Sequence, residues 1–280
     1  MELPVERWYP AIFKRHSRRT YSGQVPEEDK LARLDRACRE FRPFPEVRSQ
    51  LVRKSPETVF KGLVGHYGRV NGAPMYVAFI GEMRSPRVQE AAGYTGEGII
   101  LEATALGLDT CWVGGFFRPE SARSQIATRE GEKVLSVTPV GYAPQEKTRQ
   151  EKIMSGLVKS RLRKPLAKLV GGKIIAPWMG KALEAARLAP SAQNRQPWRF
   201  RIEKDAVFIS ADKSFSPSSI SKRLDCGIAM LHFELGALAA GVPGTWEILP
   251  SSDVARFIFS HKMLSRRKPL PGGRDRVGGL

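Results

Sequence analysis

One internal repeat constrains the fold of this chain more than any other feature. Five residues of the first half recur in the second half, each displaced by 134 residues (227 − 93 for the first pair). The pairs are Gly93 and Gly227, Ala103 and Ala237, Ala105 and Ala239, Gly107 and Gly241, and Trp112 and Trp246. In both halves they follow the same order of a helix, a glycine that ends it, and a strand with a tryptophan. The sequence therefore predicts two related half-domains in one polypeptide.

Hydrophobic periodicity predicts helices and strands in both halves. Apolar residues recur at helical spacing in four segments, which are 26–41, 99–106, 182–189 and 228–238. Short apolar or alternating runs predict strands at 75–80, 110–113, 135–137, 198–202 and 206–209. Each half therefore combines helices with strands.

Composition bounds the class of protein and of partner. The chain has 280 residues, of which 41% are apolar and 26% charged, as expected for a globular protein with a substantial core. Lys and Arg number 46 against 28 Asp and Glu, a formal charge of +18. Such a charge suits phosphorylated cofactors, nucleic acid or a membrane surface, and a solvated basic surface is the alternative explanation.

Cysteine usage and the N-terminal residues indicate a cytoplasmic protein. Cys38, Cys111 and Cys226 lie far apart in apolar context, without the spacing of metal ligands, and are expected to be buried free thiols. The first ten residues lack the apolar core of a signal peptide. No run approaches the roughly 18 apolar residues that a membrane span needs. We therefore expect no membrane partner.

A basic segment near the start of the chain is a candidate phosphate site. Residues 12–21 include Arg15, His16, Ser17 and Arg19. Guanidinium groups form paired charge-assisted hydrogen bonds with phosphate, and Ser17 adds a small donor. A positively charged, exposed helix face is the alternative explanation.

A proline-bracketed loop in the second half is a candidate ligand site. Pro190 and Pro197 restrict the directions of the hydroxyl and amide side chains between them. Ser191 and three amides would suit a flat heteroaromatic ligand, because each amide offers donors and acceptors. A helix exit whose amides form turn hydrogen bonds is the alternative.

Two further segments carry weaker signals. Gly114 and Gly115 follow a predicted strand, so the main chain could approach a ligand closely there, although a plain turn is the alternative. Residues 145–168 are strongly basic but lack the interleaved aromatic residues of a single-strand binding groove. Phosphate contact or a solvated connection is therefore favoured over nucleic acid.

The two halves differ where the candidate sites lie. The basic segment at 15–19 has no counterpart in the second half, and the loop at 189–198 has none in the first. Each half holds what the other lacks. A pair of such halves would form one complete site at their junction and one dead site.

Several of these segments together resemble the FMN-dependent nitroreductases, and more narrowly their tandem "TM nitroreductase" branch. The resemblance is carried by residues 15–19, 189–198, 107–116 and 140–142, and it covers most of residues 10–250. It implies an α+β fold of two tandem half-domains, each a mainly antiparallel sheet flanked by helices. The halves are expected at 1–150 and 177–260, with a basic connector at 151–176 and a disordered basic tail at 261–280.

The resemblance also implies where FMN would bind. The phosphate would lie on the segment that contains Arg15, His16, Ser17 and Arg19, helped by Arg161 and Arg163. The flavin ring would meet Pro190, Ser191, Ala192 and Asn194 from the second half. Main-chain donors of Val113, Gly114 and Gly115 would approach N5. Many relatives have an acidic residue before the glycine where Gly114 stands, so this chain departs from the family pattern there.

By the same resemblance, the chain would be an oxidoreductase that passes hydride from NAD(P)H through FMN to a nitroaromatic, a quinone or a similar acceptor. The flavin carries the chemistry in such enzymes, which fits the lack of an evident acid–base pair in the sequence. The partners of the chain would be small-molecule electron acceptors, and the chain would work as a monomeric pseudo-dimer. One alternative is another flavin reaction on the same fold, such as dehalogenation or reduction with a different hydride donor. The other is a flavin-free basic module that binds nucleic acid or a partner.

Overall fold

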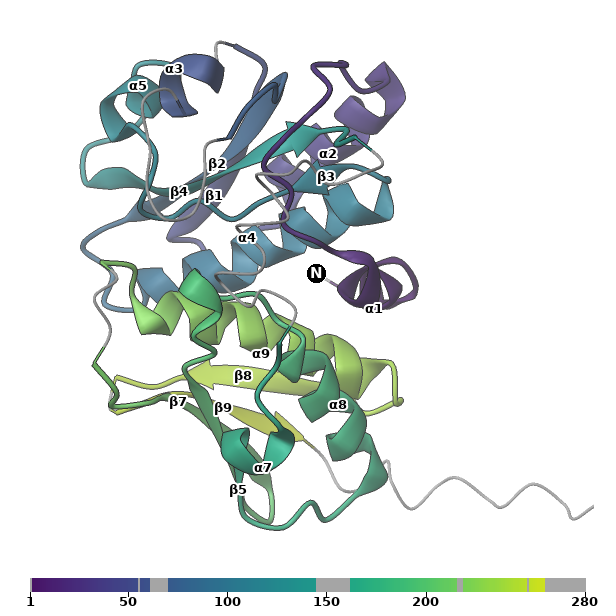
Figure 1. The fold of residues 1–280 in the computed structure, drawn as a ribbon. Coiled ribbons are helices and arrows are strands. Elements are labelled where there is room, and N and C mark those ends of the chain that lie inside the picture. The colour runs from purple at the N-terminus through teal and green to yellow at the C-terminus, as the bar shows by residue number, and fades with distance from the viewer. Residues whose placement is uncertain are drawn as a thin grey trace, which may run out of the picture.

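The structure is a computed structural model that describes residues 2–54, 56–60, 70–144, 162–215, 219–250 and 252–259. It has two halves, one above the other in Figure 1. The first half contains α1 (Val5–Lys14), α2 (Glu28–Glu40), β1 (Val47–Val52), α3 (Pro56–Phe60), β2 (Met75–Glu82), α4 (Val88–Ala105), β3 (Asp109–Thr110), α5 (Pro119–Arg123) and β4 (Glu132–Gly141). The second contains α7 (Leu166–Leu169), β5 (Val170–Gly171), α8 (Pro177–Arg187), a 3₁₀ turn (Ala192–Asn194), β6 (Trp198–Ile202), β7 (Ala206–Ala211), α9 (Lys222–Leu238), β8 (Gly244–Ile248) and β9 (Asp253–Phe259).

Each half is built on its own sheet, and the two sheets share one strand order. The first sheet runs β1-β2-β4-β3 with antiparallel neighbours. The second runs β5-β6-β7-β9-β8, and its pairs are antiparallel except for β5 with β6. Without β5, the two orders correspond strand for strand. The predicted α+β class of two antiparallel-dominated halves is confirmed.

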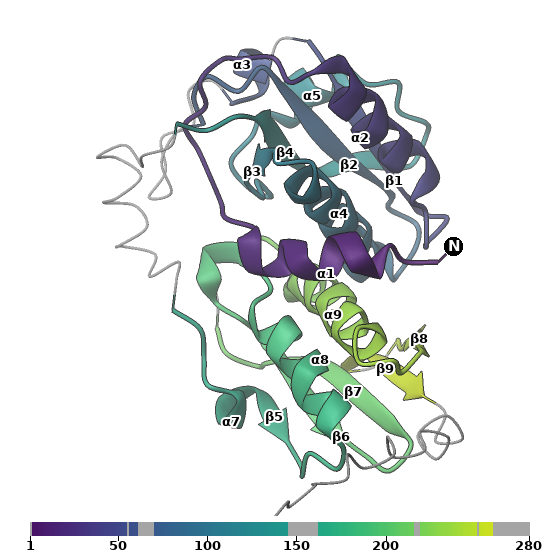
Figure 2. The same cartoon turned by 90° about the vertical axis from the view of Figure 1, so that its right-hand side faces the viewer.

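Two central helices, α4 and α9, join the halves. They lie side by side between the two sheets in both Figure 1 and Figure 2, and α1 packs across the pair. A Cβ atom added to Gly93 would lie 2.0 Å from the carbonyl oxygen of Leu224, and one added to Gly227 would lie 2.0 Å from that of Glu90. Leu224 is itself displaced by 134 residues from Glu90 (224 − 90). Such reciprocal contacts are what a two-fold relation between the halves produces.

The glycine pair at the helix ends also repeats. Gly107 after α4 and Gly241 after α9 both have a φ of +77°, a left-handed conformation that glycine adopts without steric cost. The predicted helix–glycine–strand repeat is therefore visible in the backbone as well as in the sequence.

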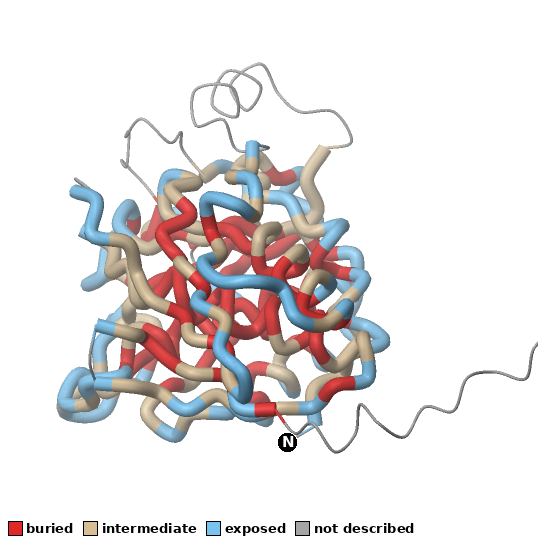
Figure 3. Tube along the Cα trace, turned by 90° about the horizontal axis from the view of Figure 1, so that it is seen from below, coloured by how far each residue is buried: buried red, intermediate tan, exposed pale blue. Residues whose placement is uncertain are grey.

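Both halves contribute to one hydrophobic core. Figure 3 shows buried residues through the middle of the molecule. The main core cluster includes Leu34 and Ile100 from the first half and Leu231 and Phe257 from the second. Along α4 and α9 nearly every residue is buried, as expected for helices covered on all sides.

The structure departs from the sequence predictions in several places. The strand expected at 110–113 ends at Thr110, because the Cys111 N–H donates to the Thr138 hydroxyl and Val113 only forms a bridge with Val137. Elements not predicted include α1, β1, α3, α5 and β9. The range expected as the connector, 151–176, is described from residue 162 onward, and it contains α7 and β5. The expected basic tail at 261–280 lies outside the described residues.

Within the described ranges, no helix combines the length and the apolar character that crossing a membrane requires.

Candidate functional site

A cleft at the junction of the two halves collects most of the predicted site residues. It is lined by eleven of them: Arg15, Ser17, Arg19, Val113, Gly114, Gly115, Arg163, Pro190, Ser191, Ala192 and Asn194. His16 is exposed and does not line the cleft, since its Nδ1 donates instead to the carbonyl oxygen of Lys14 (2.6 Å). Arg161 lies outside the described residues. The fold thus brings the basic segment of one half against the amide loop of the other.

One end of the cleft is strongly cationic. The Arg15 side chain is only 6% exposed, and its Nε lies 3.8 Å from Glu97 Oε1 without a hydrogen bond to a described residue. Arg163 donates to Asn194 Oδ1 (3.1 Å) and to the Leu188 carbonyl oxygen (3.3 Å). Burial, with Arg15 and Arg187 nearby, lowers the pKa of Arg163 to about 10. Cations from both halves therefore repel one another here, and an anion would relieve that repulsion.

The basic segment is held in the cleft by main-chain contacts. It leaves α1 at Arg15, whose N–H still bonds to the Ala11 carbonyl oxygen (2.9 Å). Ser17 then forms a parallel bridge with Thr110, and the Arg18 N–H donates to the Thr110 carbonyl oxygen (2.9 Å). The end of β3 therefore positions the residues that the sequence marked as a phosphate site.

The loop after α8 forms the opposite wall, and its amides divide into two groups. Gln193 and Asn194 line the cleft, whereas Gln196 is only 3% exposed and turned into the protein. The Gln196 N–H donates to Ser191 Oγ (2.9 Å), and its side-chain oxygen accepts the Lys164 N–H (2.7 Å). The alternative explanation from sequence, that amides form turn hydrogen bonds, thus holds for Gln196. Asn194 is also held by hydrogen bonds, since its Oδ1 accepts from Arg163 and its Nδ2 donates to the Leu162 carbonyl oxygen (2.9 Å). Gln193 and Asn194 both form part of the cleft wall.

A glycine pair allows close approach between the halves on the third side of the cleft. A Cβ atom on Gly114 would lie 3.0 Å from Ile220 Cδ1, and one on Gly115 would lie 3.5 Å from Ser219 Oγ. A side chain at Gly114 would crowd Ile220, which also lines the cleft. The main chain at these glycines is therefore part of the cleft wall itself.

Comparison with known proteins identifies the family. The family described as "Putative TM nitroreductase" matches residues 7–237, which is most of the chain. The chain belongs to this family. The resemblance inferred from the sequence is confirmed.

The chain is also similar to solved structures. A putative nitroreductase from Thermotoga maritima has a TM-score of 0.60 at 20% identity, covering 92% of this chain and 96% of that one. A nitroreductase family protein from Clostridium difficile has a TM-score of 0.45 at 19% identity, covering 60% of this chain and 98% of that one. A nitroreductase with bound FMN from Bacteroides fragilis has a TM-score of 0.40 at 19% identity, covering 50% and 93%. Among curated proteins, none matches the chain significantly.

A buried polar cluster beneath the cleft of this nitroreductase family member escaped prediction. Glu97 on α4 and His232 on α9 are both fully buried, with His232 Nε2 2.8 Å from Glu97 Oε1. His232 Nδ1 donates to the Ala185 carbonyl oxygen (3.0 Å), and Trp112 in the cleft wall donates to Glu97 Oε2 (2.6 Å). A carbonyl oxygen only accepts hydrogen bonds, so the proton on His232 Nδ1 serves the contact with Ala185 and not the contact with Glu97. This cluster ties the two halves together behind Arg15 and Trp112.

Asp225 is a second polar residue that escaped prediction. It lies in α9, lines the cleft and is 1% exposed. Burial raises the pKa of its carboxyl to about 6, although Arg195 beside it opposes that shift. The other lining residues not predicted are mostly apolar, namely Phe60, Val70, Cys111, Trp112, Phe116, Gln193, Ile220, Leu224 and Ile228. Polar residues within otherwise apolar helical segments were the available signal for Asp225, Glu97 and His232.

Proposed function

We propose that this chain is an oxidoreductase that binds FMN in the cleft and uses NAD(P)H to reduce a small electron-poor acceptor, such as a nitroaromatic or a quinone. One observation carries the proposal. In a member of a nitroreductase family, Arg15 from one half and Asn194 from the other line the same cleft. The two ends of that cleft offer the two kinds of partner that a flavin mononucleotide needs.

The cationic end fits a phosphate group. Arg15 Nε is buried without a hydrogen bond to a described residue, and a buried donor left unpaired is costly. Arg15 and Arg163 also share this end of the cleft. A phosphate dianion would provide acceptor oxygens for the guanidinium groups and compensate their like charges. Ser17 and Arg19 line the same region and would complete the phosphate site.

The rest of the cleft fits a flat heteroaromatic ring. Ile220, Leu224 and Ile228 give it apolar walls, and Gln193 adds an amide group that can donate or accept hydrogen bonds. Bound FMN would supply the electron-transfer chemistry, which amino acids alone do not. The protein would bind and orient the ring, exclude water, and place cations where negative charge develops.

Both halves contribute lining residues to this cleft, so we propose that a single chain suffices as the working unit. The three cysteines are buried and form no disulfide. Free thiols suit a reducing compartment, and we propose that the protein works in the cytoplasm.

Titration of the purified protein with FMN tests the proposal. We expect a yellow complex with one flavin per chain and quenched flavin fluorescence. Arg15→Ala should weaken FMN binding by about 10- to 100-fold, the loss expected for charge-assisted hydrogen bonds. Arg39→Ala is the matched control, because Arg39 is an exposed α2 arginine that pairs with Asp35 away from the cleft.

Two results would count against this function. Protein that is colourless after excess FMN has been removed, and that shifts RNA in a gel, would favour the basic-module alternative. Equal FMN affinity in the Arg15→Ala and Arg39→Ala variants would show that Arg15 does not bind the FMN phosphate. Oxidation of NADH and NADPH with a panel of quinones and nitro compounds would then define the donor and the acceptor.

A further inference from the structure

The ligand-facing loop after α8 holds an unfavourable backbone conformation. Gln193, Asn194 and Gln196 have φ values of 56°, 54° and 46°. Residues with side chains seldom adopt this left-handed region, and here three non-glycine residues do so within four positions. The two prolines identified from the sequence do not impose positive φ on these residues. Other contacts must therefore stabilise the loop in this shape.

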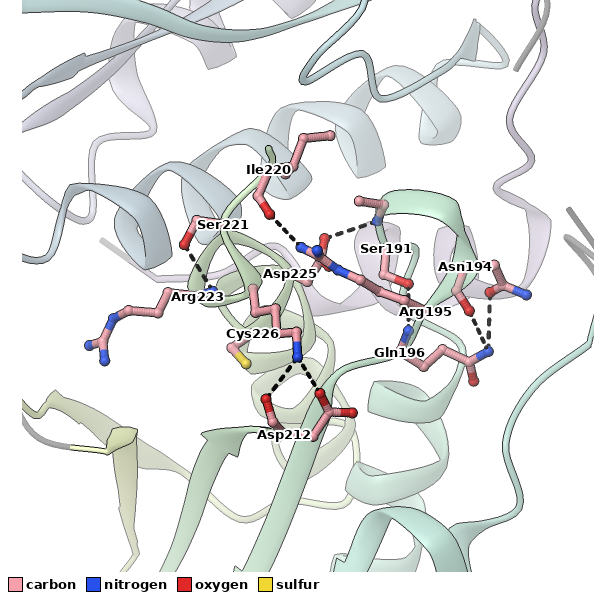
Figure 4. A network of polar contacts seen from close by, with 12 residues as sticks. Ser191, Asn194, Arg195, Gln196, Asp212, Ile220, Ser221, Arg223, Asp225 and Cys226 are labelled. Atoms are coloured by element: carbon pink, nitrogen blue, oxygen red, sulfur yellow. Dashed lines mark hydrogen bonds and ion pairs between the residues drawn. The ribbon is translucent and has the colours of Figure 1, made fainter. Parts of the chain in front are cut away.

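Asp225 supplies two of those contacts from α9. Its Oδ1 accepts the main-chain N–H of Ala192 (3.0 Å), and its Oδ2 accepts Arg195 Nε (2.7 Å). Figure 4 shows Asp225 beside the Arg195 side chain. Ala192 and Arg195 stand on either side of the left-handed pair Gln193 and Asn194. One buried carboxylate thus anchors both sides of this left-handed pair.

Arg195 extends the same attachment to the start of α9. Its Nη2 donates to the Ile220 carbonyl oxygen (2.8 Å), and its side chain is 12% exposed. Ile220 in turn contacts the Gly114 region of the first half. The loop, α9 and the glycine wall are therefore joined through Arg195 and Asp225.

We infer that Asp225 is a positioning residue: it holds the loop so that Ser191, Gln193 and Asn194 face the ligand in the cleft. The inference rests on the proposed function for the identity of that ligand, but the ordering of the loop is a property of the protein alone. Asp225 acts through Ala192 and Arg195. With an uncharged or shortened side chain at this position, the loop would no longer be held in its left-handed conformation.

The first test measures the loop without FMN. Hydrogen exchange of the peptide that covers 191–196 is compared for wild type, Asp225→Ala and Asp225→Asn. We expect exchange to be at least about tenfold faster in Asp225→Ala, which loses both hydrogen bonds. Asp225→Asn should show a smaller increase, because its amide oxygen can still accept the Ala192 N–H while its NH₂ group faces Arg195.

Asp253→Asn is the matched control. Asp253 is a partly buried carboxylate of the second half that pairs with Arg201 (2.9 Å), and it does not line the cleft. Exchange at 191–196 should remain at the wild-type rate in this variant. Unchanged exchange in a folded Asp225→Ala protein would overturn the inference. If Asp225→Ala does not fold, the same comparison is made with Asp225→Asn and Arg195→Gln.

The second test connects the loop to the cofactor. FMN affinity of Asp225→Asn, Arg195→Gln and the double variant forms a double-mutant cycle, and we expect the double variant to bind about as weakly as either single one. Independent, additive losses would contradict an action of Asp225 through Arg195. Faster loop exchange with unchanged FMN affinity would also overturn the inference. Wild-type protein that binds no FMN would instead defeat the proposed function and leave the exchange test standing.

Discussion

Two segments that follow corresponding helices have opposite effects on the junction between the halves. Residues 188–197, after α8, carry the amide loop and border an open cleft. Residues 41–46, after α2, carry Phe41 and Phe44, which pack against Tyr94 of α4 with ring centroids 6.3 Å and 5.4 Å away. Tyr94 corresponds in the repeat to Ile228, which lines the cleft. The same packing of α4 against α9, called the shared frame below, therefore accommodates an open junction and a filled one.

A charge difference accompanies the aromatic one. Glu90 near the filled junction is buried and accepts two hydrogen bonds from Arg223, at 2.9 Å from Nε and 2.6 Å from Nη2. Its counterpart in the repeat is Leu224, an apolar lining residue of the open cleft. The repeat conserves the backbone frame at the central helices, while side chains at corresponding positions decide whether a cavity remains.

The largest effect should come from breaking the shared frame. Gly93→Ala and Gly227→Ala would each place a methyl group 2.0 Å from a main-chain oxygen, which cannot move without shifting a central helix. We expect each to lower the free energy of unfolding by about 3 kcal/mol or more, with similar losses for the two. Urea unfolding measures both. Gly180→Ala in α8 is the control, since nothing lies within 4 Å of its added Cβ and it should slightly stabilise the helix. A tolerated Gly227→Ala with a damaging Gly93→Ala would contradict the reciprocal packing.

A pH effect of similar size is expected near the filled junction. Tyr94 donates a hydrogen bond to Glu234 (2.7 Å), and burial raises the pKa of Glu234 from 4.5 to about 7. The folded protein then keeps a proton that the unfolded chain releases, so the contribution of Glu234 to stability is fully present below about pH 4.5 and is lost as pH rises toward 7. At 1.36 kcal/mol per pKa unit, the loss is roughly 3 kcal/mol.

Glu234→Gln isolates that contribution. Because the amide cannot ionise, the variant should lose less stability than wild type between pH 5 and pH 8 in urea unfolding. Glu247→Gln is the control, since Glu247 is an exposed β8 carboxylate paired with Arg256. Parallel pH profiles for wild type and Glu234→Gln would show that this carboxyl does not hold a proton.

The smallest effect on stability should come from converting the open junction toward the filled one. Ile228→Tyr places in the cleft the aromatic residue that stands at the corresponding position 94. We expect FMN affinity to fall by at least about tenfold, because the ring would occupy apolar space that the flavin needs. Equilibrium titration measures the affinity, and thermal unfolding should show a near-wild-type midpoint. Ile228→Val keeps the space open and should bind FMN normally. Undiminished FMN binding by Ile228→Tyr would show that the flavin does not bind in this cleft.

The sequence predicted the strongly periodic parts of the fold. It also predicted the cleft residues that lie in the basic segment, the glycine pair and the proline-bracketed loop. Apolar stripes predicted α4, α8 and α9, and the glycine repeat predicted their common frame. Strand β1 has no adequate periodic signal of its own and becomes a strand through pairing with β2, whereas the apolar run at 254–259 is a signal from which β9 could have been predicted. The partners of Asp225 and His232 could not be predicted, because a polar residue within an apolar helix does not reveal which distant segment faces it. Tertiary packing alone brings Ala192, Arg195 and Glu97 to them.

A crystal structure of the chain with FMN would test the central claim most directly. The account predicts one flavin per chain, with its phosphate at Arg15 and Arg163 and its ring against residues 190–194. A flavin bound elsewhere, or a second one between Phe41 and Tyr94, would contradict it.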